Sequence, residues 1–191
     1  MQALELIPQI AAEFKQIFGR DSGGLVRTYR IEDAETVVVA LGSLLGTIKD
    51  TVDQLRAEGH KIGVLGINSF RPFPIPDIRD ALEKTQRVVV VEKCFAVGIG
   101  GIVSRDVRMA LRNRPQPVLT VVAGLGGRAV TMGSLRKMLL EAMADKLEPL
   151  TFLDLDWKIV NKQLERDRQK RRSGPIAEAI LRDIGVVAAS L

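Results

Sequence analysis

The sequence has few of the residues on which most metal centres, disulfide scaffolds and redox sites depend. Among its 191 residues there is a single cysteine, Cys94, and a single histidine. One thiol can form no disulfide within the chain, and it cannot supply the several thiolates that an iron–sulfur cluster needs. We therefore expect a reduced, cytoplasmic setting, with Cys94 as a buried structural residue rather than a reactive thiol.

Long hydrophobic runs and a strong charge of one sign are also missing. The longest apolar stretch, residues 36–48, is interrupted by glycine and serine and is too short to span a membrane. The net charge of +5 arises from 28 basic against 23 acidic residues, and aromatic residues make up only 4% of the chain. Such a mild basic excess is not typical of nucleic-acid-binding proteins. We expect neither a membrane nor a nucleic acid as a partner.

Short apolar runs that alternate with helical patterns are what the sequence does have. Four runs rich in β-branched residues occupy 36–42, 61–67, 87–93 and 117–125, and a helical pattern follows each of them. Strands that are apolar throughout are buried on both faces, as in a parallel sheet covered by helices. We predict an α/β fold over residues 33–146, with a doubly wound, mostly parallel sheet of about five strands.

The two ends of the chain have other patterns. Apolar residues in 3–18 recur at three- and four-residue steps, which predicts one apolar face of a helix. We expect this helix to form part of an N-terminal arm and linker, residues 1–32, and to contact another domain or subunit. The interface residues predicted here are Leu4, Ile7, Ile10 and Phe14. Residues 147–191 are expected to be a C-terminal extension, an extended segment plus helices with a basic run at 169–172.

Two loops that follow predicted strands have residues suited to an anion. The loop ALGSLLGT opens a helix, and GLGGR ends on an arginine. The N-terminus of a helix and a guanidinium group both attract phosphate or carboxylate. The glycine spacing of a dinucleotide site and the lysine of a P-loop are absent, so a structural turn is the simpler interpretation. The anion site is the alternative, with Gly42, Ser43, Gly46, Thr47 and Arg128 as its candidate residues.

Two further connections have backbones suited to contact with another domain. The segment Arg71, Pro72, Phe73 and Pro74 places prolines between a strand and a helix, and a stiff backbone loses little entropy on association. The loop CFAVGIGG contains Gly98, Gly100 and Gly101, which allow close approach of another backbone. We expect both segments at an interface; a connector rigidified for the fold alone is the alternative for RPFP.

Spacing brings together no nucleophile with a base, no paired acid and base, and no set of metal ligands. We therefore expect no catalytic, cofactor-binding or metal-binding residue in this chain. A binding or assembly domain is favoured over a self-sufficient enzyme.

The order of several motifs resembles a known family. Gly19–Arg20, Tyr29 with EDAE at 32–35, the stretch from VVVALGS to RPFP, RVVVVEK, DVRMAL and GLGGRAVT follow one another at family-like spacing. In this order they resemble the C-terminal part of the α subunit of pyruvate:ferredoxin oxidoreductase and its 2-oxoacid relatives. That part is similar to the C-terminal domain of transketolase. The likeness covers residues 19–146.

The resemblance implies a non-catalytic assembly or interface domain within a thiamine-diphosphate-dependent 2-oxoacid:ferredoxin oxidoreductase, with pyruvate as the expected 2-oxoacid. Such an enzyme converts a 2-oxoacid and coenzyme A to acyl-CoA, CO2 and reduced ferredoxin. It also implies that thiamine diphosphate, Mg²⁺ and [4Fe–4S] clusters belong to the rest of the complex and not to this chain. The partners would be the other subunits or domains, with ferredoxin and coenzyme A reached through the complex.

Two other functions stay open. The chain could be the equivalent domain of another thiamine enzyme, of the transketolase or indolepyruvate type, whose partners would carry no ferredoxin-type clusters. It could also be an independent anion- or nucleotide-binding module that uses ALGSLLGT and GLGGR. Micromolar nucleotide binding by the isolated chain would favour that module.

Overall fold

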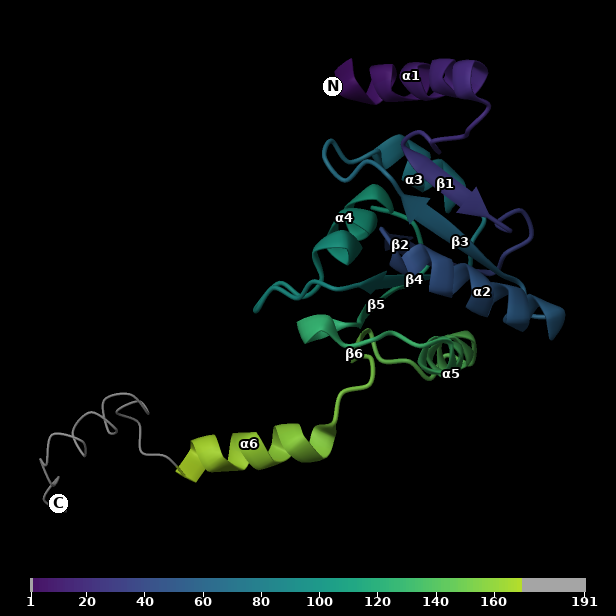
Figure 1. Cartoon of the computed structure of the whole chain (residues 1–191). Coiled ribbons are helices and arrows are strands. Elements are labelled where there is room, and N and C mark those ends of the chain that lie inside the picture. Colours follow the sequence, from purple (N-terminus) through teal and green to yellow (C-terminus); the bar gives the residue numbers. More distant parts are fainter. Residues whose placement is uncertain (1, 170–191) are drawn as a thin grey trace, which may run out of the picture. The chain divides into compact units, whose positions relative to one another are not determined.

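The computed structural model of the chain describes residues 2–169. It divides into two compact units, Met1–Asp154 and Leu155–Leu191. The first unit contains a six-stranded sheet with the strand order β1-β3-β2-β4-β5-β6 (Figure 1). This arrangement confirms the predicted α/β fold with a mostly parallel sheet, and it has one strand more than the five or so expected.

Four strands coincide with the predicted apolar runs. They are β2 (Thr36–Leu41), β3 (Ile62–Ile67), β4 (Arg87–Glu92) and β5 (Val118–Val122). All are parallel: β2 pairs with β3 on one side and β4 on the other, and β4 pairs with β5. Almost every residue of β2, β3 and β4 is buried, because helices cover both faces of the sheet.

Two edge strands extend the sheet beyond residues 33–146. β1 (Val26–Tyr29) runs antiparallel to β3, within the segment expected to be an arm and linker. β6 (Leu150–Phe152) runs parallel to β5, within the expected C-terminal extension. Both strands are short and only half-buried, so neither has the continuous apolar run by which a central strand is recognised.

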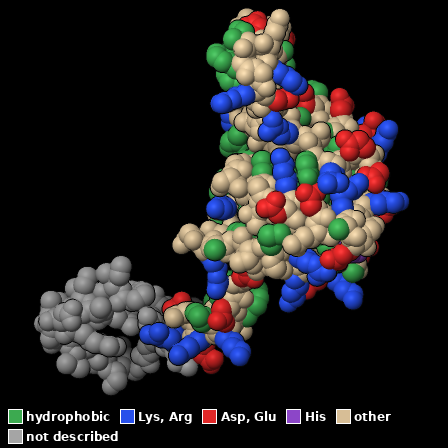
Figure 2. Space-filling model, turned by 45° about the vertical axis from the view of Figure 1, so that its right-hand side comes forward, with side chains coloured by type: hydrophobic (Ala, Val, Ile, Leu, Met, Phe, Trp, Pro, Cys, Tyr) green, Lys and Arg blue, Asp and Glu red, His purple; other side chains and the backbone are tan. Residues whose placement is uncertain are grey.

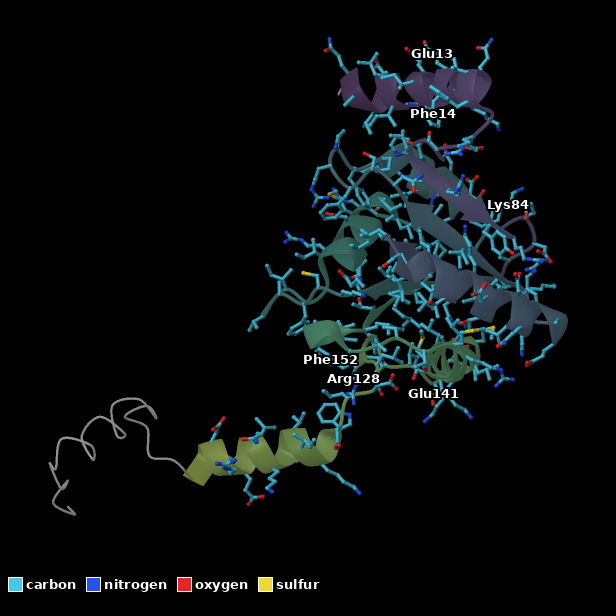
Figure 3. All side chains as sticks on the ribbon, in the orientation of Figure 1. Glu13, Phe14, Lys84, Arg128, Glu141 and Phe152 are labelled. Carbon is cyan, nitrogen blue, oxygen red and sulfur yellow. The ribbon has the colours of Figure 1, made fainter. Side chains whose placement is uncertain are left out.

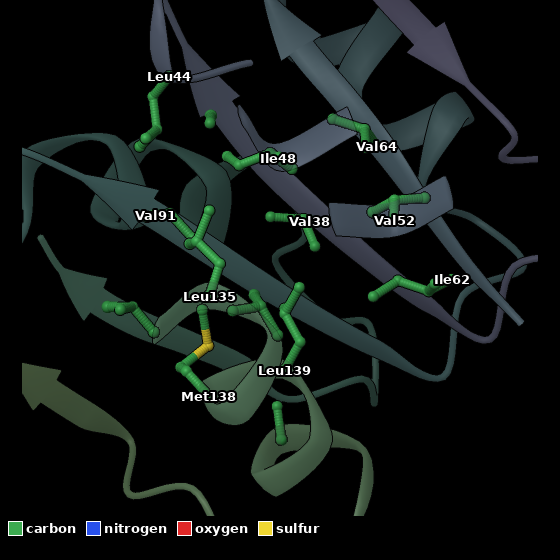
Figure 4. Packing of buried hydrophobic residues seen from close by; sticks show 14 of the residues in the cluster. Val38, Leu44, Ile48, Val52, Ile62, Val64, Val91, Leu135, Met138 and Leu139 are labelled. Atoms are coloured by element: carbon green, nitrogen blue, oxygen red, sulfur yellow. The ribbon is translucent and has the colours of Figure 1, made fainter. Parts of the chain in front are cut away.

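Helices on the two faces of the sheet bury two separate apolar clusters. α2 (Leu44–Ala57) and α5 (Met132–Met143) cover one face, and α3 (Ile75–Ala81) and α4 (Ile102–Ala110) cover the other. Figure 4 shows the first cluster, in which Ile48 and Leu139 pack beside Val38. Neighbouring side chains of a strand point to opposite faces, which explains why Val37 and Val39 belong to the second cluster.

The chain leaves the sheet in opposite directions after its two central strands. β2 leads into α2 on one face, whereas its neighbour β4 leads into α4 on the other. In open α/β sheets, connections that diverge in this way leave a crevice at the carboxyl ends of the strands. The topology therefore identifies the place where a binding site is most expected.

The N-terminal helix α1 (Gln2–Phe18) forms as predicted and has no buried residue. Leu4 and Ile7 are half-buried, and Ile10 and Phe14 are exposed. Glu13 and Phe14 point to different sides of the helix (Figure 3), and apolar side chains follow one side of it in Figure 2. The apolar face of α1 thus has little covering it among residues 2–169.

The second unit contributes α6 (Trp157–Gln169), and a short 3₁₀ helix, Leu125–Gly127, follows β5 in the first unit. Trp157, Ile159 and Leu164 of α6 are exposed. Most of the predicted basic run at 169–172 lies outside the described residues. No helix in the described part of the chain is both long enough and apolar enough to cross a bilayer.

Gly63 of β3 provides a test of the close packing between the sheet and the connection before β2. A methyl group at Gly63 would lie 2.6 Å from the carbonyl oxygen of Arg30 and 3.0 Å from the Cα of Ile31. Because both are backbone atoms, the chain must shift, and we expect Gly63→Ala to lower the free energy of unfolding by about 1–3 kcal/mol.

Gly46→Ala is the matched control, since the added methyl group meets nothing within 4 Å in α2. Its free energy of unfolding should stay the same or rise by up to about 1 kcal/mol, because alanine favours the helix. Chemical denaturation measures both variants. Equal effects at the two positions would contradict the close approach at Gly63.

Candidate docking site at the carboxyl ends of the strands

Four connections meet at one edge of the sheet because the strands that they follow are parallel. We call residues 42–43, 68–74, 93–101 and 123–131 the carboxyl-end loops; they follow β2, β3, β4 and β5 respectively. Most of the residues predicted for an interface or an anion site belong to them. The structure therefore gathers these candidates at one edge, while those of the N-terminal helix lie on α1.

A pocket of about 480 Å³ opens at the carboxyl ends of β2 and β4, where the connections after these strands diverge. Its volume is in the range of sites that hold small molecules or protruding side chains. Most of its wall is apolar. The apolar residues come from the ends of β2 and β4, the connector after β3 and the starts of α2 and α4: Leu41, Leu44, Phe70, Val91, Ile102 and Val103. The polar residues of the wall are Ser43, Glu92, Lys93 and Cys94.

Glu92 is the buried charge of this pocket, and it holds the start of α4. The backbone N–H of Val103 donates to its Oε2 at 2.8 Å, and that of Ser104 donates to its Oε1 at 3.0 Å. A Cβ atom on Gly101 would lie 1.9 Å from Oε1, so a residue with a side chain cannot occupy that position without displacing the carboxylate. Both oxygens of Glu92 are therefore committed to the helix N-terminus, which a negative charge stabilises.

Sequence reasoning did not identify Glu92. The available signal was an acidic residue that directly ends a run of four valines, RVVVVE, since an acid at that position must find donors in the fold. Phe70, Ile102 and Val103 had no comparable signal, because only the tertiary structure brings them to one pocket.

The connector RPFP is attached to α4 within the same unit. Arg71 Nη1 lies 2.8 Å from Oδ2 of Asp106 as a close ion pair, without the geometry of a hydrogen bond. Its guanidinium group stacks 4.0 Å from the ring centroid of Phe70, and the peptide bond between Arg71 and Pro72 is cis. The ion pair with Asp106 and the stacking on Phe70 support the alternative that the connector is rigid for the fold. The interface role of Arg71, Pro72, Phe73 and Pro74 stays a prediction.

The residues of the predicted anion site follow two strands that are not neighbours. Gly42, with a φ of 74°, and Ser43 follow β2, whereas Arg128 follows β5, and β4 lies between these strands. Arg128 donates a hydrogen bond to the carbonyl oxygen of Asp154 (Figure 3 labels Arg128). Gly46 and Thr47 lie in the first turn of α2. An anion site that needs both loops stays a prediction.

The loop after β4 carries apolar side chains into solvent. Ala96 and Gly100 form an isolated β-bridge, so the residues between them make a narrow tip, and Gly98 and Gly100 have positive φ angles. On this tip the side chain of Val97 is 90% exposed and that of Ile99 is 57% exposed. Cys94 is exposed as well, so the expectation of a buried cysteine was wrong. It lies in the loop beyond β4, outside the layer that the helices cover.

The resolved pKa shifts at the amino ends of β2 and β3 come from surface ion pairs. A hydrogen bond from Arg56 holds the pKa of the Asp33 carboxyl below its ordinary value, and a hydrogen bond to Glu35 raises the pKa of Lys61. These residues precede β2 and β3, so they lie at the edge opposite the carboxyl-end loops. Basic and acidic side chains are interspersed on the face seen in Figure 2. The shifts indicate structural pairs and not a reactive centre.

The donor set of the described residues bears on two metal-containing groups, a metal ion held by protein side chains and an iron–sulfur cluster. Among residues 2–169, no group of three or more His, Cys, Asp or Glu side chains could hold a metal ion. A [4Fe–4S] cluster takes four thiolates, and the sequence has one cysteine.

The role of Glu92 leads to a prediction about stability. Glu92→Ala leaves two buried N–H groups at the start of α4 without an acceptor, and we expect it to lower the free energy of unfolding by about 2–4 kcal/mol. Glu92→Gln retains one acceptor oxygen and should have a smaller effect. The exposed Glu83, which pairs with Arg114, provides the control: Glu83→Ala should change stability by less than about 0.5 kcal/mol. Equal denaturation midpoints for Glu92→Ala and Glu83→Ala would contradict this role.

Comparison with known proteins identifies the sequence family. The family model of the pyruvate:ferredoxin oxidoreductase core domain II matches residues 34–135. The pyruvate synthase subunit PorA of Methanosarcina barkeri is 42% identical over 143 residues, which cover 73% of this chain and 36% of that protein. PorA of Thermotoga maritima is 41% identical over 145 residues, covering 75% and 37%. The ketoisovalerate oxidoreductase subunit VorA of Pyrococcus horikoshii is 37% identical over 133 residues, covering 69% and 34%.

Two solved structures share the fold at low sequence identity. A 2-oxoglutarate:ferredoxin oxidoreductase from Magnetococcus marinus aligns with a TM-score of 0.51 and 21% identity, over 68% of this chain and 21% of that chain. A split-gene transketolase, an inactive β4 tetramer, aligns with a TM-score of 0.50 and 23% identity, over 63% and 42%. The chain spans about a third of the length of the PorA and VorA relatives. Because the family model covers more than half of it, this chain belongs to the pyruvate:ferredoxin oxidoreductase core domain II family.

Proposed function

We propose that this chain is a non-catalytic assembly domain of a thiamine-diphosphate-dependent 2-oxoacid:ferredoxin oxidoreductase, with pyruvate as the first substrate to test. The observation that carries the proposal is the match of residues 34–135 to core domain II. The names of the relatives, pyruvate synthase and ketoisovalerate oxidoreductase subunits, support a 2-oxoacid as the substrate class.

The length of the relatives supports an assembly role. About two thirds of each PorA relative lies outside the part that this chain matches. The complementary polypeptide is defined as the sequence from the same source that matches this remaining part of PorA. It is produced as a separate protein. The catalytic groups and cofactors would come from it and from further subunits, since the described residues of this chain lack a fitting donor set.

Binding and cofactor titrations test the proposal. We expect the chain and the complementary polypeptide to form a stable complex with a dissociation constant below about 1 µM, as for other specific interfaces. Calorimetric titration of the isolated chain with thiamine diphosphate and MgCl₂ should give no saturable heat. The copurified complex should reduce methyl viologen with pyruvate and coenzyme A, and the isolated chain should not. Saturable cofactor binding by the isolated chain, or the absence of a complex, would overturn the proposal.

The apolar face of α1 gives a separate prediction about assembly. If it docks on the complementary polypeptide, the double variant Ile10→Glu and Phe14→Glu should weaken the complex at least tenfold, because two carboxylates would have to be desolvated. Both residues are exposed, so the thermal unfolding of the sheet should be unchanged. Affinity is measured by calorimetry.

Ala12→Glu is the control for this variant. Ala12 is exposed and lies about 200° around the helix from Ile10, so its carboxylate stays in water. It should change the affinity less than twofold. Unchanged affinity in the double variant would exclude docking through α1, and a lower unfolding temperature would show that α1 belongs to the core.

A further inference from the structure

The pocket at the carboxyl ends of β2 and β4 is bordered by the start of the loop that follows β4, through Lys93 and Cys94. Phe70, in its wall, is 38% exposed, and the loop that leaves β4 beside the pocket carries Val97 and Ile99 in solvent. Exposed apolar side chains on a loop that borders an apolar pocket are typical of a protein interaction site. We call the pocket together with Val97 and Ile99 the docking pocket.

The polar groups of the docking pocket favour a protein partner over a small molecule. A small-molecule site orients its ligand through a few polar groups that converge on it. The buried polar group here is Glu92, and both of its oxygens already accept hydrogen bonds from α4. What remains for an occupant is mainly apolar wall, which suits an apolar side chain or a short apolar segment of a protein.

The charge of the surrounding loops indicates the chemistry of that partner. The carboxyl-end loops contain three charged residues, and all three are basic: Arg71, Lys93 and Arg128. Arg71 is paired with Asp106, whereas no ion pair of Lys93 occurs among the residues that the structure describes. The complementary surface is therefore apolar at its centre and acidic around it, because opposite charges at a rim favour the correct encounter.

We propose that the docking pocket binds an apolar side chain of the complementary polypeptide, on a face of that polypeptide edged with acidic residues. This inference rests on the proposed function, and it adds a second contact surface to α1. Two observations support this choice of partner. About two thirds of PorA lies outside the part that this chain matches, and basic loops surround an apolar pocket. Gly98 and Gly100, with positive φ angles, keep the loop tip free of side chains that would hold the partner away.

The test compares the affinity of the full chain and of its variants for the complementary polypeptide by calorimetry. Val97→Glu places a carboxylate on an exposed tip that faces an acidic, apolar surface, and it should raise the dissociation constant at least tenfold. Phe70→Ala should raise it by a similar factor through lost apolar contact. Lys93→Ala should weaken binding less, and it should reduce the dependence of the affinity on salt.

Met109→Glu is the matched control, since Met109 is an apolar residue of α4, 50% exposed, outside the docking pocket. It should change the affinity less than twofold. Denaturation midpoints check that each variant is folded. If Phe70→Ala is unstable, Val97→Glu decides the test. Val97 is 90% exposed, so its replacement should change the stability of the fold little.

Each result decides between distinct outcomes. If the chain binds the complementary polypeptide and Val97→Glu binds equally well, the docking pocket is excluded while the proposed function stands. If the unaltered chain forms no complex, the proposed function fails and the docking pocket loses its occupant. Sedimentation measures whether the chain associates with itself. If it does, and Val97→Glu abolishes this association, the occupant is a second copy of the chain. Saturable binding of ATP or inorganic phosphate that Lys93→Ala removes would identify a ligand site; both of these results overturn the inference.

Discussion

The carboxylate of Glu92 joins the end of the central strand β4 to the start of α4, and much of the carboxyl-end edge depends on it. Two charge-assisted hydrogen bonds from Val103 and Ser104 fix where the helix begins, and the lack of a side chain at Gly101 leaves room for the carboxylate. The position of α4 in turn sets the wall of the pocket and places Asp106 against Arg71. A buried acid in a pocket thus serves as an anchor for the backbone.

Because Glu92 holds the start of α4, its carboxylate is less available to a ligand at this edge of the sheet. Diverging connections after β2 and β4 form the crevice in which many α/β proteins bind a ligand. Here the carboxylate of Glu92 accepts hydrogen bonds from the start of α4, and most of the remaining wall is apolar. An apolar crevice of this kind is compatible with the proposed contact surface.

The sequence predicted the centre of the fold well and its edges less well, for one physical reason. Strands β2, β3 and β4 are buried on both faces, so they had to be apolar throughout, and their runs were visible. β1 and β6 are covered in part only, so a few half-buried residues were enough and gave no pattern. The exposure of Cys94 and the assembly of the pocket depend on where the loop after β4 lies, which spacing along the chain does not encode. The apolar face of α1 was predictable because helical periodicity is local.

Two surfaces of this chain, the face of α1 and the docking pocket, hold apolar side chains in water, and stability alone gives no reason for either. Val97 at the loop tip is 90% exposed, and Ile10 on α1 is 59% exposed. An exposed apolar residue by itself is ordinary, but clusters at two separate places are unfavourable for a domain that stays alone in solution. A partner that covers both surfaces accounts for them together. Contact at two separate surfaces also restricts the orientation of a domain more than contact at one surface does.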